Sequence, residues 1–97
     1  MKFIISGSLK DNIYSLMRKV GYHFLKEEKD ELSFTRPLER SGYPRFHLYL
    51  KESNEEIIFN LHLDQKRPIY KGTPAHAGEY EGPVVEKEIE RIKQILK

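Results

Sequence analysis

Two stretches in the middle of the chain alternate between apolar and polar residues, and this alternation constrains the fold more than any other feature. A period of two is typical of a strand with one buried face, so residues 45–50 and 57–63 are predicted to be strands. The polar segment 52–55 between them is typical of a hairpin loop. The apolar positions, which should share one face, are Phe46, Leu48, Leu50, Ile57, Phe59, Leu61 and Leu63.

The register of this hairpin is also predicted, because a slip by one residue would expose one of the two apolar sets. On the opposite face the same register brings polar side chains together, with long ones within reach of their diagonal neighbours. The predicted cross-strand pairs are Leu50 with Ile57, Leu48 with Phe59, Phe46 with Leu61, His47 with Asn60, and Arg45 with His62.

The remaining periodicities predict two helices and three further strands. Ser8 is a suitable N-cap for a helix that carries apolar residues at helical spacing and ends at Gly21. Pro83 suits the first position of a second helix, whose apolar stripe runs to Leu96. The further strands are predicted at 3–5, 22–26 and 32–36, with a charged turn at 27–30.

Together these elements predict one α+β domain over residues 1–97, in the order β-α-β-β-β-β-α. A sheet with one apolar face needs a covering layer, so we expect a two-layer sandwich. Its mostly antiparallel sheet would have four to five strands, with both helices packed on one face. Residues 64–82 have no clear period and are predicted to form a long functional or mobile loop, with a short strand around 69–70.

The composition limits the expected cellular compartment and the kinds of site that the chain can form. The chain has no Cys, which excludes disulfides and Cys-ligated metals and suits a reducing compartment. No stretch is apolar enough to span a membrane or to serve as a signal peptide, so a cytoplasmic location and no membrane partner are expected. The formal net charge of +2 is by itself weak support for any partner.

A meander of the four middle strands would sort charge between the two ends of the sheet. The turns at 27–30 and 52–55 would form an acidic end, and the loop 37–44 and the segment after Leu63 a basic, aromatic one. Such an end suits phosphates and stacked bases, although charged loops are often only solvated. The residues predicted to bind there are Arg36, Arg40, Tyr43, Arg45, Lys66, Arg67, Tyr70 and Lys71.

The face away from the helices is expected to present His47, Tyr49, Asn60 and His62 to solvent. A polar face is ordinary in an antiparallel sheet, but such a face is also a usual platform for RNA. His47 and His62 are weak candidates for an acid–base pair that cleaves RNA, with Arg45 stabilising the charged phosphorane.

A metal site is a further alternative on the same face. His62 and Asp64 are two residues apart on one strand and therefore point to the same side. His76 or Glu79 from the long loop would complete a set of His and carboxylate ligands for zinc or a similar ion. The spacing matches no established metal motif, and no cofactor is predicted.

The stretch from Gly42 to His47 resembles a feature of HicA-type messenger-RNA-cleaving toxins, in which a His follows a Gly-Ser pair at the start of a strand. Here the Ser is missing and the spacing differs, so the resemblance implies RNA as a ligand without identifying a member of that family.

The sequence therefore predicts a binding module for RNA or another anionic ligand, at the basic end and on the open face. One alternative is a protein-interaction domain or homodimer that uses the open face or an edge strand. The other is a His-based or metal-dependent hydrolase. Whether the chain is an enzyme stays open at this stage.

Overall fold

A computed structural model describes residues 1–6, 12–65, 78–79 and 82–96. Its elements, in chain order, are β1 (Lys2–Ser6), α1 (Ile13–Val20), β2 (His23–Glu28), β3 (Glu31–Pro37), β4 (Arg45–Ser53), β5 (Glu56–Asp64), β6 (Gly78–Glu79) and α2 (Pro83–Leu96).

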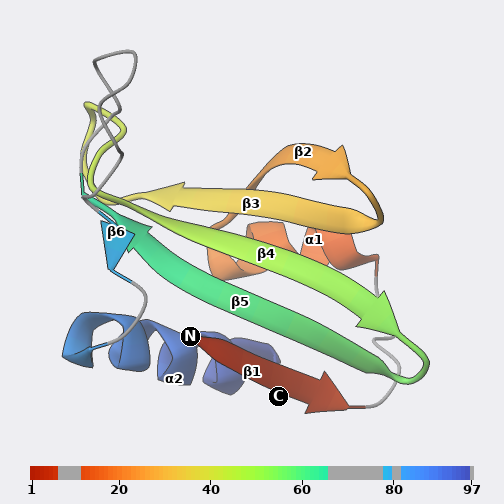
Figure 1. Cartoon of the computed structure of the whole chain (residues 1–97). Coiled ribbons are helices and arrows are strands. Elements are labelled where there is room, and N and C mark those ends of the chain that lie inside the picture. The colour runs from red at the N-terminus through yellow and green to blue at the C-terminus, as the bar shows by residue number, and fades with distance from the viewer. Residues whose placement is uncertain (7–11, 66–77, 80–81, 97) are drawn as a thin grey trace.

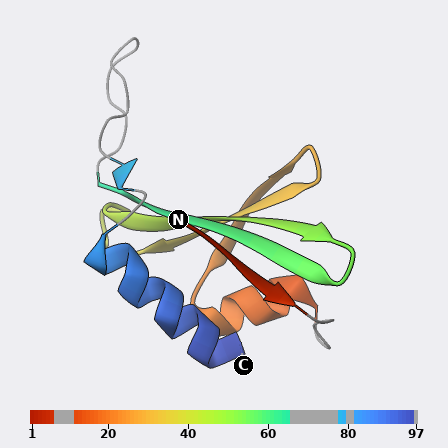
Figure 2. The same ribbon diagram turned by 60° about the horizontal axis from the view of Figure 1, so that its bottom comes forward.

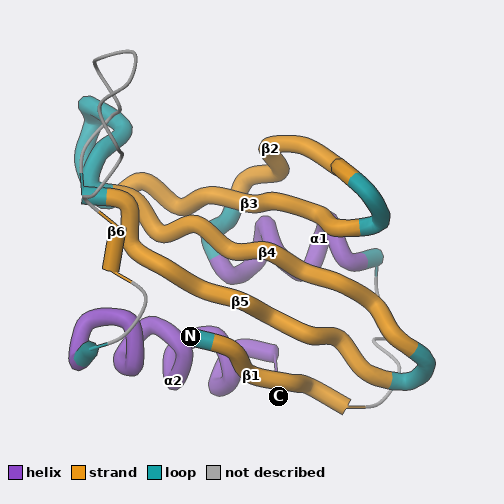
Figure 3. The backbone as a smooth tube through the Cα atoms, in the orientation of Figure 1, coloured by secondary structure: helices purple, strands orange, loops and turns teal. Residues whose placement is uncertain are grey.

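The strands form one antiparallel sheet in the order β1-β5-β4-β3-β2, and the two-residue β6 extends the β1 side by pairing with the end of β5. The predicted meander of the four middle strands is confirmed. Both helices lie on the same side of the sheet (Figures 1 and 2), so the predicted two-layer α+β sandwich is also confirmed. The tube in Figure 3 shows the twist of the sheet, with β2 curving along its edge beside β3.

The core lies between the sheet and the helices and is filled by the predicted apolar faces. Phe46, Leu48 and Leu50 of β4 are buried there, as are the matching residues of β5. From the helices, Met17 and Val20 of α1 join them. Burying the side chains of both layers against each other stabilises the fold by roughly 25 cal/mol for each Å² of apolar surface removed from water.

The predicted register of the β4–β5 hairpin is wrong by two residues. Leu50 faces Phe59 rather than Ile57, and His47 faces His62 rather than Asn60. A shift by two keeps every side chain on its predicted face, so the alternation could not detect it. The turn decides, because Asn54 adopts a left-handed φ of 54° and the strands pair until Ser53 faces Glu56.

The start of the first helix also differs from the prediction. The described helix begins at Ile13, and Asn12 rather than Ser8 is its N-cap, with the Asn12 Oδ1 accepting a hydrogen bond of 2.8 Å from the Tyr14 N–H. Ser8 lies outside the described residues. Asn is among the strongest N-cap residues, which explains the later start. The helix ends at Gly21, with a φ of 100°, as predicted.

Two turns and one loop position the ends of the sheet. The turn at Lys29–Asp30, with both φ values positive, and the turn after Ser53 lie at the predicted acidic end. At the other end, the loop between β3 and β4 is closed by a hydrogen bond from the Leu38 N–H to the Pro44 carbonyl. In the described part of the chain, no helix has the length and apolar character needed to cross a membrane.

Two strands include residues of the predicted long loop at 64–82. Asp64 is the last residue of β5, and Gly78 pairs with it as the first residue of β6. The strand expected around residues 69–70 lies outside the described residues, as do the predicted ligands Lys66, Arg67, Tyr70, Lys71 and His76. For Glu79, the backbone pairing with Leu63 is described.

Candidate functional site

The polar cluster lies on the sheet face opposite the helices, near the basic end. Three adjacent strands supply it, because residues that face each other across a ladder point to the same side. Thr35 of β3 faces His47 of β4, and His47 faces His62 of β5. One step along the strands, Ser33 faces Tyr49, and Arg45 faces Asp64.

The two histidines are buried, which corrects the expectation that they face solvent. His47 and His62 each expose only 7% of their surface, and Ser33 beside them exposes 3%. The prediction placed them on the right face and together, but a sheet face without helices was assumed to be wet. Tyr49 and Asn60, from the same predicted face, are half-buried.

Asp64 is the centre of the cluster, because each of its carboxylate oxygens contacts a different imidazole. The His62 Nε2 lies 2.8 Å from Oδ1. The His47 Nδ1 lies 3.4 Å from Oδ2, and the Arg45 Nε donates to the same oxygen at 3.2 Å. Two imidazoles from neighbouring strands thus converge on one carboxylate.

The charge of the Asp64 carboxylate is held by these contacts. Burial would raise its pKa, but the hydrogen bonds from His47, His62 and Arg45 together outweigh burial and hold the pKa well below its usual range. Asp64 is therefore an anion throughout the physiological range. An anion with lone pairs directed at two imidazole nitrogens is a good ligand for a cation.

The other side of His47 is fixed by Ser33. The Ser33 Oγ lies 2.5 Å from the His47 Nε2. A hydroxyl can donate or accept, so it can serve either tautomer of the ring. Ser33 was not among the predicted site residues, because finding it requires the β3–β4 register.

Tyr49 packs against both imidazoles and helps to bury them. Its ring stacks on His47 with centroids 4.4 Å apart and lies 5.6 Å from the ring of His62. The two imidazoles are 4.9 Å apart. Packing by neighbouring rings restricts rotation of the imidazoles, which preorganises the nitrogens that point at Asp64.

The ligand atoms of His47, His62 and Asp64 lie within 4.8 Å of one another. Zinc ligands at about 2.0–2.2 Å from a tetrahedral ion are separated by roughly 3.3 Å, so the cluster is slightly more open than a filled site. Two imidazoles and one carboxylate are a known ligand set for zinc and for other divalent transition metals. The predicted ligands His62 and Asp64 thus come together, but with His47 as the third member.

The row of Ser33, His47 and Asp64 also suggests a second function, in which Ser33 is the nucleophile of a hydrolase. Hydrogen bonds connect the three side chains as in a hydrolase triad. However, Ser33 is almost fully buried in the middle of the sheet. The backbone groups of β3 form hydrogen bonds with the strands on both of its sides. This position is unfavourable for attack on a substrate carbonyl, which also needs free backbone N–H donors nearby. The hydroxyl is therefore suited to supporting the imidazole.

The described residues of the predicted basic end do not all come together. Arg36 points to the helix side, where its Nη1 lies 3.4 Å from the carboxylate of Glu88. Arg45 pairs with Asp64, and its guanidinium lies over the Tyr43 ring at 4.7 Å. Arg40 is exposed in the loop. Among the described arginines of this end, Arg45 is the one that the structure brings to the histidine cluster.

A second polar network was not predicted, and it lies on the helix side. Glu88 of α2 is buried, and it accepts a hydrogen bond of 2.6 Å from Tyr22 and two from Arg91. Arg91 also donates to the Val20 carbonyl at 2.7 Å. The position of Glu88 in the sequence did indicate that it would be buried, because it falls on the same helical stripe as Val85 and Ile92.

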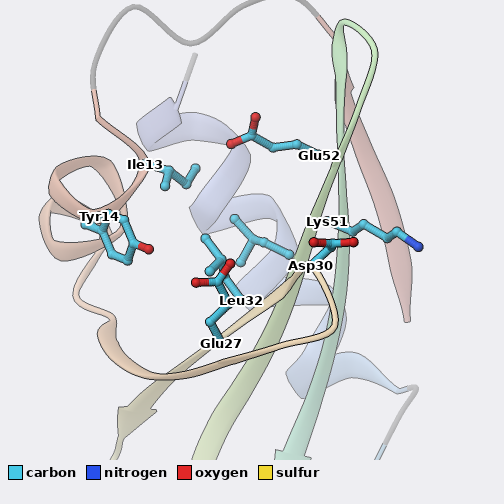
Figure 4. A pocket seen from close by; sticks show the side chains of 8 residues that line it. Ile13, Tyr14, Glu27, Asp30, Leu32, Lys51 and Glu52 are labelled. Atoms are coloured by element: carbon cyan, nitrogen blue, oxygen red, sulfur yellow. The ribbon is translucent and has the colours of Figure 1, made fainter.

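A hollow of about 520 Å³ lies at the acidic end, between α1 and the two turns (Figure 4). Ile13 and Tyr14 of α1 line one side. Glu27 and Glu52 line it from the strands, whereas the ammonium group of Lys51 points away. The hollow carries no imidazole and lies at the opposite end of the sheet from Asp64, so it is separate from the histidine cluster.

Comparison of the chain with protein-family models, with curated proteins and with solved structures found no match.

Proposed function

We propose that this chain is a metal-dependent hydrolase in which His47, His62 and Asp64 bind one divalent transition-metal ion of the zinc class. The observation that carries the proposal is the convergence of two imidazole nitrogens and one carboxylate from adjacent strands. Rigid strands are good supports for such a set, because precise ligand placement is easier on a sheet than on a loop.

Ser33 supports the metal reading. A metal-binding histidine nearly always donates its second ring N–H to an oxygen, which fixes the tautomer and the ring orientation. The His47 Nδ1 faces Asp64, and its Nε2 contacts the Ser33 hydroxyl. With Nδ1 on the ion, Nε2–H would donate to Ser33.

The chemistry follows from the number of ligands. Three protein ligands leave at least one position for water, and a zinc-bound water has a pKa near 7. The site would thus supply hydroxide at neutral pH. This hydroxide would add to an ester or amide centre, the bond to the leaving group would break, and the leaving group would take up the proton that the bound water released.

The geometry gives less support to an RNA platform. Its two imidazoles are buried, and Arg36 lies on the other face of the sheet. Recognition of an anionic ligand keeps its support from Arg45 and from the exposed Arg40 of the neighbouring loop. An anionic ligand is therefore retained as part of the proposed function.

Self-association is a second candidate, supported by exposed apolar side chains on both edge strands. Ile4 of β1 is 55% exposed, and Phe24 and Leu25 of β2 are 47% and 45% exposed. Unpaired edges with apolar side chains are common docking sites for another strand. Sedimentation equilibrium should give twice the 11.5 kDa of one chain if the edges pair, and the monomer mass at high concentration would contradict this candidate.

Metal titration tests the proposed function. After removal of metal with a chelator, the protein should bind one equivalent of Zn²⁺ in competition with a chromophoric chelator, and Co²⁺ should give visible bands of a low-coordinate site. His62→Ala should lose this binding. His23→Ala is the matched control, because His23 is an exposed imidazole on β2 and should leave binding unchanged. Equal binding by both variants would contradict the proposal.

A further inference from the structure

We infer that the substrate of this site is a phosphate ester and that Arg45 binds its phosphoryl oxygens beside the metal ion. The inference rests on the proposed function, because it takes the ion at His47, His62 and Asp64 as given. It goes further by naming a substrate class and the residue that selects it.

The position of the Arg45 guanidinium is the first observation. It is held over the ring of Tyr43, with its Cζ 4.7 Å from the ring centroid, and its side chain is 23% exposed. A guanidinium stacked on an aromatic ring keeps its plane and presents its edge to a ligand.

The number of hydrogen-bond donors on Arg45 is the second observation. Its Nε donates to Asp64 at 3.2 Å. A guanidinium carries five N–H donors, and this bond uses one of them. Guanidinium nitrogens arranged as a fork match the spacing of phosphate oxygens.

The net charge of the site with the ion bound favours an anionic substrate. A divalent ion and the Arg45 guanidinium outweigh the single carboxylate of Asp64, so the site would carry a net positive charge. Binding of Asp64 to the ion would also weaken its attraction for Arg45. An oxyanion that contacts both cations would restore the balance in a site of low dielectric constant.

The short distance between the two cations selects a phosphoryl group. The ion would lie about 2.1 Å from an Asp64 oxygen. If the ion binds Oδ2, the Asp64 oxygen that lies 3.2 Å from the Arg45 Nε, that nitrogen would lie at most about 5.3 Å from the ion. A substrate whose carboxylate binds Arg45 while its scissile carbonyl binds the ion needs a longer distance between these two cations. One phosphoryl group places oxygens on both cations, so the charged group and the reacting group are the same.

The reaction is hydrolysis. The oxygen of the metal-bound water forms a bond to phosphorus, the bond from phosphorus to the ester oxygen breaks, and the departing alkoxide takes the proton that the water released. Arg45 would stabilise the charge that builds on the phosphoryl oxygens. One water is consumed, and a phosphate and an alcohol are formed.

The experiment compares three chromogenic substrates on the zinc-loaded protein. These are p-nitrophenyl phosphate, bis(p-nitrophenyl) phosphate and the uncharged p-nitrophenyl acetate. We expect a phosphate ester to be cleaved in preference to the acetate. Preference for the monoester would point to small phosphorylated molecules, and preference for the diester to nucleic acid or another phosphodiester; either result supports the inference.

Variants separate the role of Arg45 from that of the metal. Arg45→Gln should lower kcat/KM for the preferred phosphate ester by at least about tenfold while Zn²⁺ binding is retained, because it removes charge that acts on the substrate. Arg45→Lys should recover part of the loss. Arg18→Gln, at an exposed arginine of α1 on the other side of the sheet, is the control and should change kcat/KM less than about twofold.

The results of these experiments test the phosphate-ester substrate and the metal site separately. Preference of the zinc-loaded protein for the acetate, or an equal loss for acetate and phosphate in Arg45→Gln, would overturn the phosphate inference and leave the metal site standing. Failure of the wild-type protein to bind Zn²⁺ would overturn the metal-dependent hydrolase and this inference together.

Discussion

Glu88 and Asp64 are two carboxylates on opposite sides of one sheet, and each is surrounded by hydrogen-bond donors. Glu88, on the helix side, is held by Tyr22, Arg91 and Arg36. Asp64, on the other side, is held by two imidazoles and Arg45. Both satisfy the rule that a buried charge needs partners. Among the described residues, no buried side-chain nitrogen or oxygen lacks one.

The partners differ in what else they can do. A guanidinium and a phenol keep their protons over the whole physiological range, and contact with Glu88 raises the pKa of Arg91 and contributes to raising that of Tyr22. Imidazole, by contrast, can lose a proton and offer a lone pair to a metal. The Glu88 network therefore links α1, β3 and α2, whereas the Asp64 cluster also contains the imidazoles that the proposed metal site requires.

Loss of the Glu88 carboxylate should have the largest effect on stability. Glu88→Ala leaves the Tyr22 hydroxyl buried without its acceptor and two guanidiniums without their anion, which should cost about 3–5 kcal/mol of unfolding free energy. Urea denaturation measures this. Glu90→Ala, at an exposed position of the same helix, is the control. Equal stability of the two variants would show that the Glu88 network does not hold the layers together.

Loss of the Asp64 carboxylate should instead act mainly on metal binding. Asp64→Asn keeps the size of the side chain but removes the anionic ligand, so the Kd for Zn²⁺ should rise by at least about 100-fold. Competition with a chromophoric chelator gives the Kd. A Kd within a factor of a few of the wild-type value would remove Asp64 from the ligand set.

Ser33→Ala should have a smaller effect, because Ser33 only supports His47. We expect the Kd for Zn²⁺ to rise by roughly tenfold while binding persists. Hydrolysis should persist in proportion to bound metal. Complete loss of hydrolysis with full metal occupancy would favour the serine nucleophile instead.

The acid dependence of stability should separate Asp64 from ordinary surface carboxylates. Because the pKa of Asp64 is held below its ordinary value of 3.8, its contribution is fully present above that value and is lost as pH falls through the lower, folded-state pKa. In metal-free protein, Asp64→Asn should therefore flatten the decline of stability below about pH 4. Parallel pH profiles of the variant and the wild type would contradict this assignment.

The alkaline dependence should report on the other network, with the smallest effect. Burial and Glu88 raise the pKa of Tyr22 far above its ordinary value of 10.0, so the phenol stays protonated in the fold. Its contribution is present below pH 10 and falls as the unfolded chain ionises above it. Tyr22→Phe should cost about 1–2 kcal/mol at neutral pH and weaken the alkaline decline. An unchanged alkaline decline in the variant would show that Tyr22 does not cause it.

The sequence predicted the fold better than the site, for a physical reason. Alternation on β4 and β5 defines which side chains share a face, and this was enough to place His47 and His62 together. It does not define which residues face each other, because a shift by two preserves the pattern. Only the turn at Asn54 sets that register, and His47 was therefore paired with Asn60 instead of His62.

Two other features were beyond the pattern for different reasons. Glu88 lies on the apolar stripe of α2, but a charged residue is expected at the surface. Its burial is explained only by the contacts with Tyr22 and Arg91, which the sequence does not show. The burial of His47 and His62 depends on packing from several strands and on rings such as Tyr49. Tertiary packing of this kind leaves no period in the sequence.

The most direct test is an anomalous diffraction map at the zinc absorption edge from crystals of the zinc-loaded protein. One strong peak should lie on the sheet face opposite the helices, about 2.0–2.2 Å from the His47 Nδ1, the His62 Nε2 and an Asp64 oxygen. An absent peak, or a peak bound elsewhere while Asp64 keeps its contacts with both imidazoles, would contradict the metal site.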